Sequence, residues 1–182
     1  MRAACVHIPH FYVQAARLKD PRLRKRPVII GVAPEEKGFV LDCSEDLIRK
    51  GVSVSMSLKD AYQLCADACF ISLKSKEYDL LWGDILASIT GIALRIEQRE
   101  PGTVFLDITR LPGIHKSEEQ FAWTVARMIV DQFHLQAKVG IGNSRFMAFE
   151  AALSALYDIL IISPGNENKF LSSLNIERLP VP

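Results

Sequence analysis

Two histidines close to the N-terminus have side chains that could perform chemistry. His7 and His10 stand at the end of an apolar segment, three residues apart. Imidazoles bind transition metals, and His115 or His134 could complete such a site. However, this spacing on a strand end does not give the shared helical face on which two histidines normally hold zinc. We therefore favour hydrogen-bonded or solvent-facing histidines, and keep a histidine metal site as an alternative.

Carboxylates are missing where these histidines stand. Residues 1–19 contain no Asp or Glu. Asp42 and Asp107 each end an apolar segment, and we predict that Asp107 supports a strand end or caps a turn. Chemistry that depends on paired magnesium ions needs several grouped carboxylates. Residues 1–19 cannot supply a carboxylate to such a group.

The four cysteines do not form a pattern typical of disulfides or zinc. Cys65 and Cys69 lie four residues apart on a predicted helix and could bind one metal, but no further ligand is near them in the sequence. Buried small apolar residues are the favoured interpretation. Cysteine usage of this kind is typical of a reducing cytoplasm.

The composition is that of an ordinary globular protein. The chain has 182 residues, 49% hydrophobic and 24% charged, with a net charge of +1. No apolar run approaches the ~20 residues of a membrane span, and the N-terminus lacks the features of a signal peptide. The net charge neither supports nor excludes nucleic acid, but residues 17–26 carry six basic residues and one acid.

Apolar periodicity and breakers predict alternating short elements. Strands are expected over residues 2–8, 27–32, 38–42, 70–73, 94–98, 103–109, 136–141 and 159–162. Helices are expected over 11–19, 44–50, 58–66, 76–92, 118–133, 145–156 and 166–174. Ser44 is predicted to cap the second of these helices, and Ser117 with Gln120 forms a capping-box pattern.

The element order predicts an α+β fold. Residues 2–8 together with residues 76 onward give a βαββαβ order, which closes as a ferredoxin-like sheet with helices on one face. The segment between them is a long insertion with its own strands. The chain ends at residues 179–182, LPVP, a poor domain terminus. We therefore expect a fragment of a longer protein.

Five sequence motifs resemble those of the Y-family (translesion) DNA polymerases, the UmuC/DinB superfamily. They are VHIPHFYVQ at residues 6–14, DPRLRKRPVIIG at 20–31, RKGVSVSMSL at 49–58, VFLDI at 104–108 and KVGIGNS at 138–144. Their order and spacing follow the family over nearly the whole chain. The resemblance implies a ferredoxin-like palm at residues 1–10 and 76–164, and an inserted small α/β fingers subdomain at 11–75. It also implies the truncated start of a thumb at 165–182.

The resemblance also implies where catalytic residues should be. Family members hold magnesium with three carboxylates, whose positions fall on His7, Gly102 and Thr103. A further family Asp, which supplies mainly a backbone contact, falls on Pro9. Imidazole is a poor magnesium ligand, Gly102 has no side chain, and Thr103 offers one neutral hydroxyl. We therefore predict no catalytic residue, no bound metal and no cofactor, although magnesium is the cofactor of the family.

The nucleotide-binding positions are altered as well. Residues that contact the triphosphate in the family fall on Glu45, Ile48 and Leu156, and Arg49 stands one residue away. Phe11 and Tyr12 match the family's aromatic pair and are interpreted as a relic of nucleotide binding. Candidates for DNA-phosphate contacts are Arg22, Arg24, Lys25, Arg26, Lys74, Lys76 and Arg145.

The resemblance is closest to the ImuB-like branch, which lacks these carboxylates. It implies a non-catalytic adaptor that acts in DNA repair and translesion synthesis and binds damaged or primer–template DNA. The implied location is the bacterial cytoplasm, at the nucleoid, without membrane contact. Implied partners, through regions beyond Pro182, are a sliding clamp, an error-prone replicative-type polymerase and a RecA-like accessory protein. An active polymerase with a misassigned metal site remains an alternative, with Glu97 and Glu100 as the nearest acids.

Overall fold

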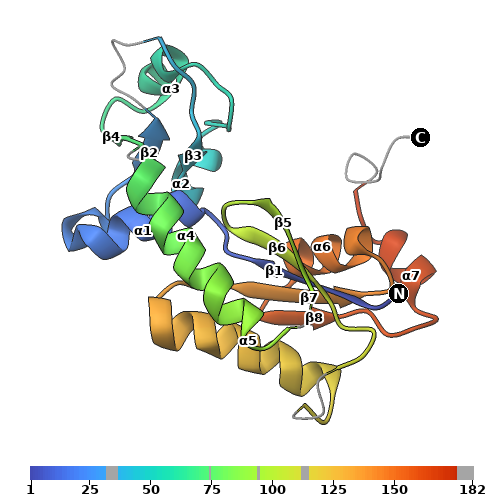
Figure 1. The fold of residues 1–182 in the computed structure, drawn as a ribbon. Coiled ribbons are helices and arrows are strands. Elements are labelled where there is room, and N and C mark those ends of the chain that lie inside the picture. The colour runs from blue at the N-terminus through green and yellow to red at the C-terminus, as the bar shows by residue number, and fades with distance from the viewer. Residues whose placement is uncertain (32–36, 74, 94, 112–114, 176–182) are drawn as a thin grey trace. The chain divides into compact units, whose positions relative to one another are not determined.

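The chain forms two compact units (Figure 1). The computed structural model describes residues 1–31, 37–73, 75–93, 95–111 and 115–175. One unit comprises Met1–Ile8 and Ile85–Pro182, and the other comprises Pro9–Asp84. The chain passes from the second unit back to the first within helix α4 (Ser75–Thr90), which is continuous across the boundary at Asp84 and Ile85. The palm and fingers boundaries expected at residues 10 and 76 therefore remain predictions.

A five-stranded sheet forms the centre of the first unit. Its strands are β1 (Ala3–His7), β5 (Ile96–Glu100), β6 (Thr103–Asp107), β7 (Lys138–Gly142) and β8 (Ile159–Ile161). Their spatial order is β5-β6-β1-β7-β8. The apolar strand β1 lies in the middle and pairs antiparallel with both β6 and β7, while β7 and β8 run parallel. This is the α+β, ferredoxin-like arrangement that the element order predicts.

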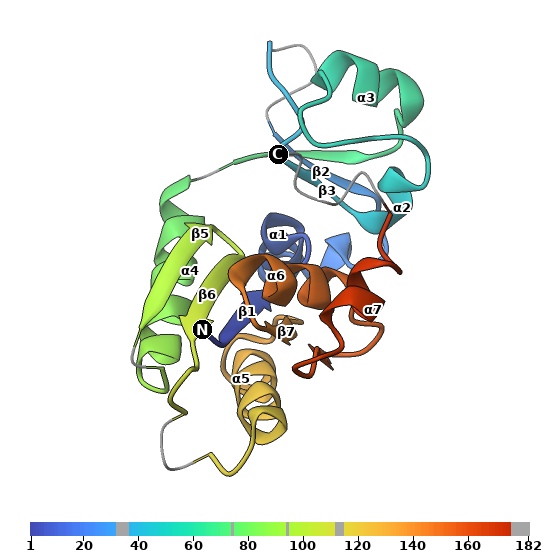
Figure 2. The same ribbon diagram turned by 90° about the vertical axis from the view of Figure 1, so that its right-hand side faces the viewer.

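Helices cover both faces of this sheet (Figure 2). The expectation of helices on one face is therefore wrong, because α6, which follows the βαββαβ elements, packs on the second face. Helix α5 (Glu118–Phe133) and the second half of α4 lie on one face, and α6 (Arg145–Ser154) lies on the other, beside α7 (Glu167–Leu171). The approach of α6 requires a glycine. A Cβ atom on Gly140 would lie 2.1 Å from the Ala148 carbonyl oxygen, so any side chain at this position would displace the helix.

Polar contacts hold the start of β1. The Arg2 guanidinium donates to both oxygens of Glu118 at 2.6 Å. It also donates to the carbonyl oxygen of Ile162 at 2.8 Å. One side chain therefore joins the central strand to α5 and to the end of β8. Bidentate pairs of this geometry are among the stronger polar contacts in proteins.

A smaller sheet organises the second unit, in the order β3-β2-β4. Its strands are β2 (Val28–Gly31), β3 (Asp42–Cys43) and β4 (Cys69–Ser72). The helices are α1 (Phe11–Lys19), the 3-10 turn η1 (Pro21–Leu23), α2 (Glu45–Ile48) and α3 (Leu58–Leu64). Ile29, Leu47 and Leu58 are fully buried in its core.

Two local predictions in this unit are wrong. Ser44 precedes α2 but makes no side-chain cap, because its hydroxyl accepts the Val28 N–H at 3.0 Å instead. The strand expected over residues 38–42 is reduced to Asp42–Cys43. The preceding residues turn toward another segment, since the Val40 N–H donates to Met56 and Phe39 forms an isolated bridge with Ser57.

Candidate functional site

Three side chains form a row across the end of the large sheet. Thr103 in β6 and Lys138 in β7 are the direct partners of His7 in β1. Directly opposed residues of antiparallel strands project to the same face. His7 Nδ1 and Thr103 Oγ1 are hydrogen-bonded at 3.0 Å, and the Lys138 ammonium donates to the Ala155 carbonyl at 2.6 Å. The structure thus brings together His7 and Thr103, two positions at which the resemblance expects carboxylates.

The third such position, Gly102, lies in the turn between β5 and β6. Its carbonyl accepts the Ile8 N–H at 2.7 Å, which places it beside the end of β1. Its φ angle is +91°, in the region that residues with a Cβ rarely adopt. An aspartate at this position would be strained in this turn. The backbone as well as the side chains therefore departs from a site that presents carboxylates here.

A cation and an aromatic ring lie next to His7. The Phe149 ring in α6 packs edge-on against His7, with ring centroids 6.1 Å apart. The Arg99 guanidinium lies 4.4 Å from the centroid of the same Phe149 ring. Two cationic side chains, Arg99 and Lys138, therefore lie in this region of the sheet.

The Glu100 carboxylate lies in the same region. Glu100 in β5 is the direct partner of Thr103, and its side chain is exposed beside Arg99, with a closest approach of 3.9 Å. By itself this exposed carboxylate cannot neutralise two magnesium ions. In the part of the chain that the structure describes, no three His, Cys, Asp or Glu side chains are grouped to hold a metal. The residues around His7 therefore do not fit the magnesium pair of the family.

Two positions of the smaller unit, Glu45 and Ile48, align with residues that contact the nucleotide in the family. Glu45 and Arg49 form an exposed ion pair at 2.7 Å, so Arg49 is engaged by the acid that precedes it. Ile48 is exposed as well. In the larger unit, Leu156 is 93% exposed in the loop after α6. None of these side chains supplies a free positive charge for a triphosphate.

Phe11 and Tyr12 belong to an aromatic cluster. The Phe11 ring is buried and packs edge-on against Trp82 at 5.5 Å and against Tyr12 at 5.4 Å. Tyr12 in turn contacts Tyr78 at 5.2 Å. The cluster gives both residues a packing role. Their interpretation as a relic of nucleotide binding stays a prediction.

Asp42, a carboxylate for which no motif predicts a function, connects several segments of the smaller unit through hydrogen bonds. Asp42 is 7% exposed and accepts the Val13 N–H of α1 at 3.2 Å and the Cys43 N–H at 2.9 Å. It also accepts from His10 Nδ1 at 3.1 Å. His10 is the left-handed residue before α1, with φ of 49°. No short-range motif signals this contact, since the two residues are 32 positions apart.

The Asp42 carboxylate raises the pKa of His10 above its ordinary value. The hydrogen bond between the two side chains is the main cause, and partial burial opposes it. Glu45 adds to the increase, whereas Arg17 reduces it. The hydrogen bond to the buried Asp42 carboxylate gives the imidazole of His10 a structural role in the smaller unit. His134 is likewise structural, as the left-handed residue that ends α5.

The remaining histidine, His115, is half-buried and packs edge-on against Phe121, with ring centroids 5.1 Å apart.

Cys65 lies within hydrogen-bond distance of Lys50 and Asp67, at 3.3 and 3.1 Å. Burial raises the pKa of the Cys5 thiol to about 12, against the nearby charge of Arg99. Cys5 therefore stays a protonated thiol at neutral pH.

The basic candidates fall into two groups. Arg22 binds Asp20 through both carboxylate oxygens, and Arg145 binds Glu97 with contacts of 2.8 and 2.6 Å. The exposed side chains of Arg24, Lys25, Arg26 and Lys76 have no acid within ion-pair distance in the described ranges. Arg17 stabilises the turn that carries residues 24–26, because its guanidinium donates to the carbonyl oxygens of Leu23 and Arg26. Lys74 lies outside the described residues.

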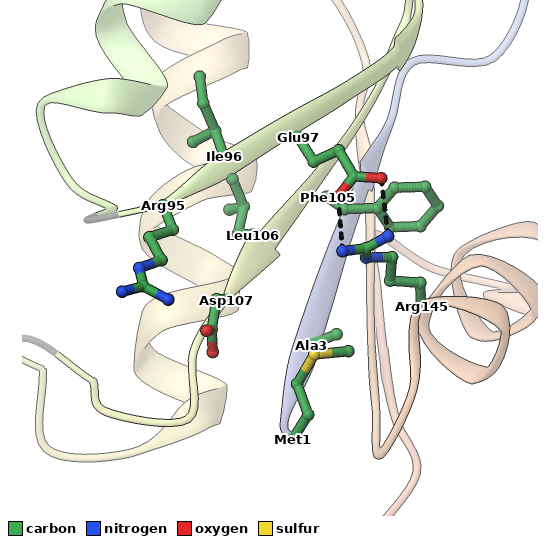
Figure 3. Close-up of a pocket in the computed structure, with 9 residues that line it drawn as sticks. All are labelled: Met1, Ala3, Arg95, Ile96, Glu97, Phe105, Leu106, Asp107 and Arg145. Atoms are coloured by element: carbon green, nitrogen blue, oxygen red, sulfur yellow. Dashed lines mark hydrogen bonds and ion pairs between the residues drawn. The ribbon is translucent and has the colours of Figure 1, made fainter.

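The Arg145–Glu97 pair forms one wall of a pocket at the other end of β1 (Figure 3). The pocket has a volume of about 510 Å3, and Ala3 and Phe105 line it. Arg95 and Asp107 stand together on the opposite side in Figure 3. Asp107 accepts the Thr109 N–H at 2.9 Å, so it caps the turn after β6 as its sequence position suggests. The pocket begins at Ala3, at the opposite end of β1 from His7.

Comparison with known proteins identifies the family. The profile of the impB/mucB/samB family matches residues 6–152, and the chain belongs to this family. A DNA polymerase IV of Streptococcus pneumoniae strain D39 is 31% identical over 172 residues, 92% of this chain and 49% of that protein. A DNA polymerase IV of Desulfotalea psychrophila is 28% identical over 167 residues, 91% of this chain and 44% of that protein.

Solved structures show the same fold. DinB from Sulfolobus solfataricus superposes with a TM-score of 0.89 at 20% identity, over 99% of this chain and 53% of that one. An insertion ternary complex of Dbh DNA polymerase gives a TM-score of 0.86 at 20% identity, over 99% of this chain and 54% of that one. The chain therefore has the palm and fingers fold of Y-family DNA polymerases, and spans about half the length of these relatives. No helix among its described residues is long and apolar enough to cross a membrane.

Proposed function

We propose that this chain is the palm and fingers of an ImuB-like, non-catalytic Y-family protein that binds DNA during translesion synthesis. The carrying observation is the His7–Thr103 pair. It stands with the left-handed Gly102 where the resemblance expects three carboxylates, and neither side chain of the pair is a hard anionic ligand for magnesium. A retained fold without those carboxylates supports binding without nucleotide transfer.

The proposed DNA contacts are the exposed basic side chains before β2, Arg24, Lys25 and Arg26, with Lys76. Arg22, Arg145 and Lys74 remain candidates, although ion pairs already engage the first two. Binding through phosphates is independent of sequence and weakens with salt. The proposal also includes damaged or primer–template DNA as ligand, the bacterial cytoplasm and nucleoid as location, and the clamp, polymerase and RecA-like partners named above.

Primer extension by the full-length protein, first with Mg2+ and then with Mn2+, tests the loss of catalysis. We expect no template-dependent incorporation above background. Incorporation that disappears in Glu100→Gln would overturn the proposal, because Glu100 is the carboxylate beside Thr103. Such a result would favour the alternative of an active polymerase with an altered metal site.

Salt-dependent binding of primer–template DNA tests the second part. Replacing Arg24, Lys25 and Arg26 by Ala together should reduce the slope of log K against log salt by about two to three, since each phosphate contact contributes about 0.9. Lys59→Ala, an exposed lysine of the same unit, is the matched control and should change the slope by less than about one. An absence of DNA binding by the full-length protein at low salt would favour a pure protein–protein adaptor.

A further inference from the structure

Strand β4 forms an open edge of the small sheet. The sheet has the order β3-β2-β4, and within the described ranges β4 pairs only with β2, in parallel (Figure 1). An edge strand presents unpaired N–H and C=O groups that another extended chain can pair with. The sequence of β4, CFIS, contains no charged residue.

The hydrogen bonds to β2 show which groups of β4 point outward. The Cys69 N–H donates to Pro27 at 2.8 Å, and the Leu73 N–H donates to Gly31 at 2.9 Å. Bonding groups alternate along a strand in a parallel pair. The backbone N–H and C=O groups of Phe70 and Ser72 therefore face the open edge.

A pocket of about 550 Å3 runs beside this edge. Ala16, Leu23, Ile71 and Tyr78 give it apolar walls. The ion pairs Lys19–Glu77 and Arg22–Asp20 line the remainder. Leu23 and Ile71 are only half-buried. A strand added to β4 would direct alternate side chains into this space, because successive side chains point to opposite faces.

One edge strand of the large sheet, β5, is different. Strand β5 carries Glu97, Arg99 and Glu100, and its register shifts between Gln98 and Glu100. Charges and bulges are the usual devices that prevent strand addition. Strand β4 has neither, so it is more accessible than β5 to an incoming chain.

Charge at one end of the groove indicates the chemistry of the occupant. The Cys69 N–H bonds to Pro27, which directly follows the exposed Arg24, Lys25 and Arg26. This end of β4 therefore lies beside three positive charges, none of which has an acid within ion-pair distance in the described part of the chain, although Asp67 is near enough to interact electrostatically with Arg26. An extended segment with an acidic residue there would be complementary in charge.

We propose that the β4 edge binds an extended segment of a partner protein as an added strand. The segment places an apolar side chain in the pocket beside Ile71 and Tyr78 and an acidic side chain near residues 24–26. Main-chain hydrogen bonds supply affinity in this mode, and pockets for alternate side chains supply specificity. This protein-binding site goes beyond the proposed binding of DNA and does not depend on it.

The test uses the full-length protein and blocked hexapeptides of alternating Thr and Val with one Asp at either the first or the last position. Amide chemical shifts are followed by NMR during titration. We expect saturable shifts at Phe70 and Ser72, and the better of the two peptides shows the direction of the added strand. The same peptide with N-methylated alternate amides should bind about tenfold more weakly or not at all.

Position 72 offers a matched pair of variants. Ser72→Pro removes an edge N–H without breaking a bond to β2, and proline is tolerated at such positions of an edge strand. This variant should bind the peptide at least about tenfold more weakly. Ser72→Ala keeps the N–H and should bind within about twofold. No saturable peptide binding, or equal binding by both variants, would overturn the proposal. If Ser72→Pro does not fold, the comparison of the N-methylated with the unmodified peptide on the wild-type protein tests the same hydrogen bonds. Equal binding of the two peptides would then overturn the proposal.

Discussion

Removal of the Asp42 carboxylate should strongly destabilise the smaller unit. In Asp42→Ala, the Val13 N–H loses the acceptor at the start of α1, at a cost of about 1 kcal/mol. The buried Cys43 N–H loses its partner, at about 1–3 kcal/mol. The charge-assisted bond from His10 adds about 1.5–3 kcal/mol at low pH. Because coupled losses do not simply add, we expect a decrease of roughly 3–5 kcal/mol.

Urea unfolding at pH 6 measures this change. Trp82 is buried against Phe11 in the same unit, so its fluorescence reports local unfolding. Trp123→Phe removes the second, more exposed tryptophan and provides the background. Asp84→Ala, at an exposed acid of the same unit, is the control and should change the free energy of unfolding by less than about 0.5 kcal/mol. A loss below about 1 kcal/mol in Asp42→Ala would refute the assigned role.

Three further outcomes follow from the described contacts. The raised pKa of His10 stabilises the folded state, fully at pH values below the unfolded pKa near 6.5 and progressively less as the pH rises through the folded pKa. His10→Gln should therefore flatten the pH dependence of the free energy of unfolding in urea above pH 6.5. Gly140→Ala forces a Cβ against the Ala148 carbonyl and should lower stability by about 3 kcal/mol or more, or prevent folding, as thermal denaturation would show. Arg2→Ala leaves Glu118 unpaired and should cost about 2–3 kcal/mol in the same assay, with Arg2→Lys recovering only part.

Local sequence signals were sufficient for most of the elements. The expected helices at 11–19 and 118–133 coincide with α1 and α5, because apolar periodicity and breakers act within a few residues. The capping pattern at Ser117 is also confirmed, since its hydroxyl accepts the Gln120 N–H at 3.1 Å. Where a residue bonds outside its own segment, the local reading was wrong. Ser44 is the clear example, because Val28 takes the hydroxyl that would have capped α2.

The candidate site was only partly predictable. Motif alignment indicated His7, Gly102 and Thr103, and the structure places these residues side by side. The alignment could not show that Arg99 lies over Phe149, because this contact joins side chains from β5 and α6. The left-handed turn at Gly102 does have a local signal, because Pro followed by Gly is typical of turns with a positive φ at the glycine.

The central position of β1 has a consequence for synthesis of the protein on the ribosome. This strand is made first, yet its partners are residues 103–107 and 138–142. At about 5–20 residues per second, His7 waits roughly 5–20 s before its first partner, Thr103, is added and roughly 7–25 s before Lys138 is added. The smaller unit, Pro9–Asp84, is complete well before then. An apolar segment therefore stays unpaired while the insertion can already fold, and during this interval the nascent chain is most exposed to aggregation and chaperone binding.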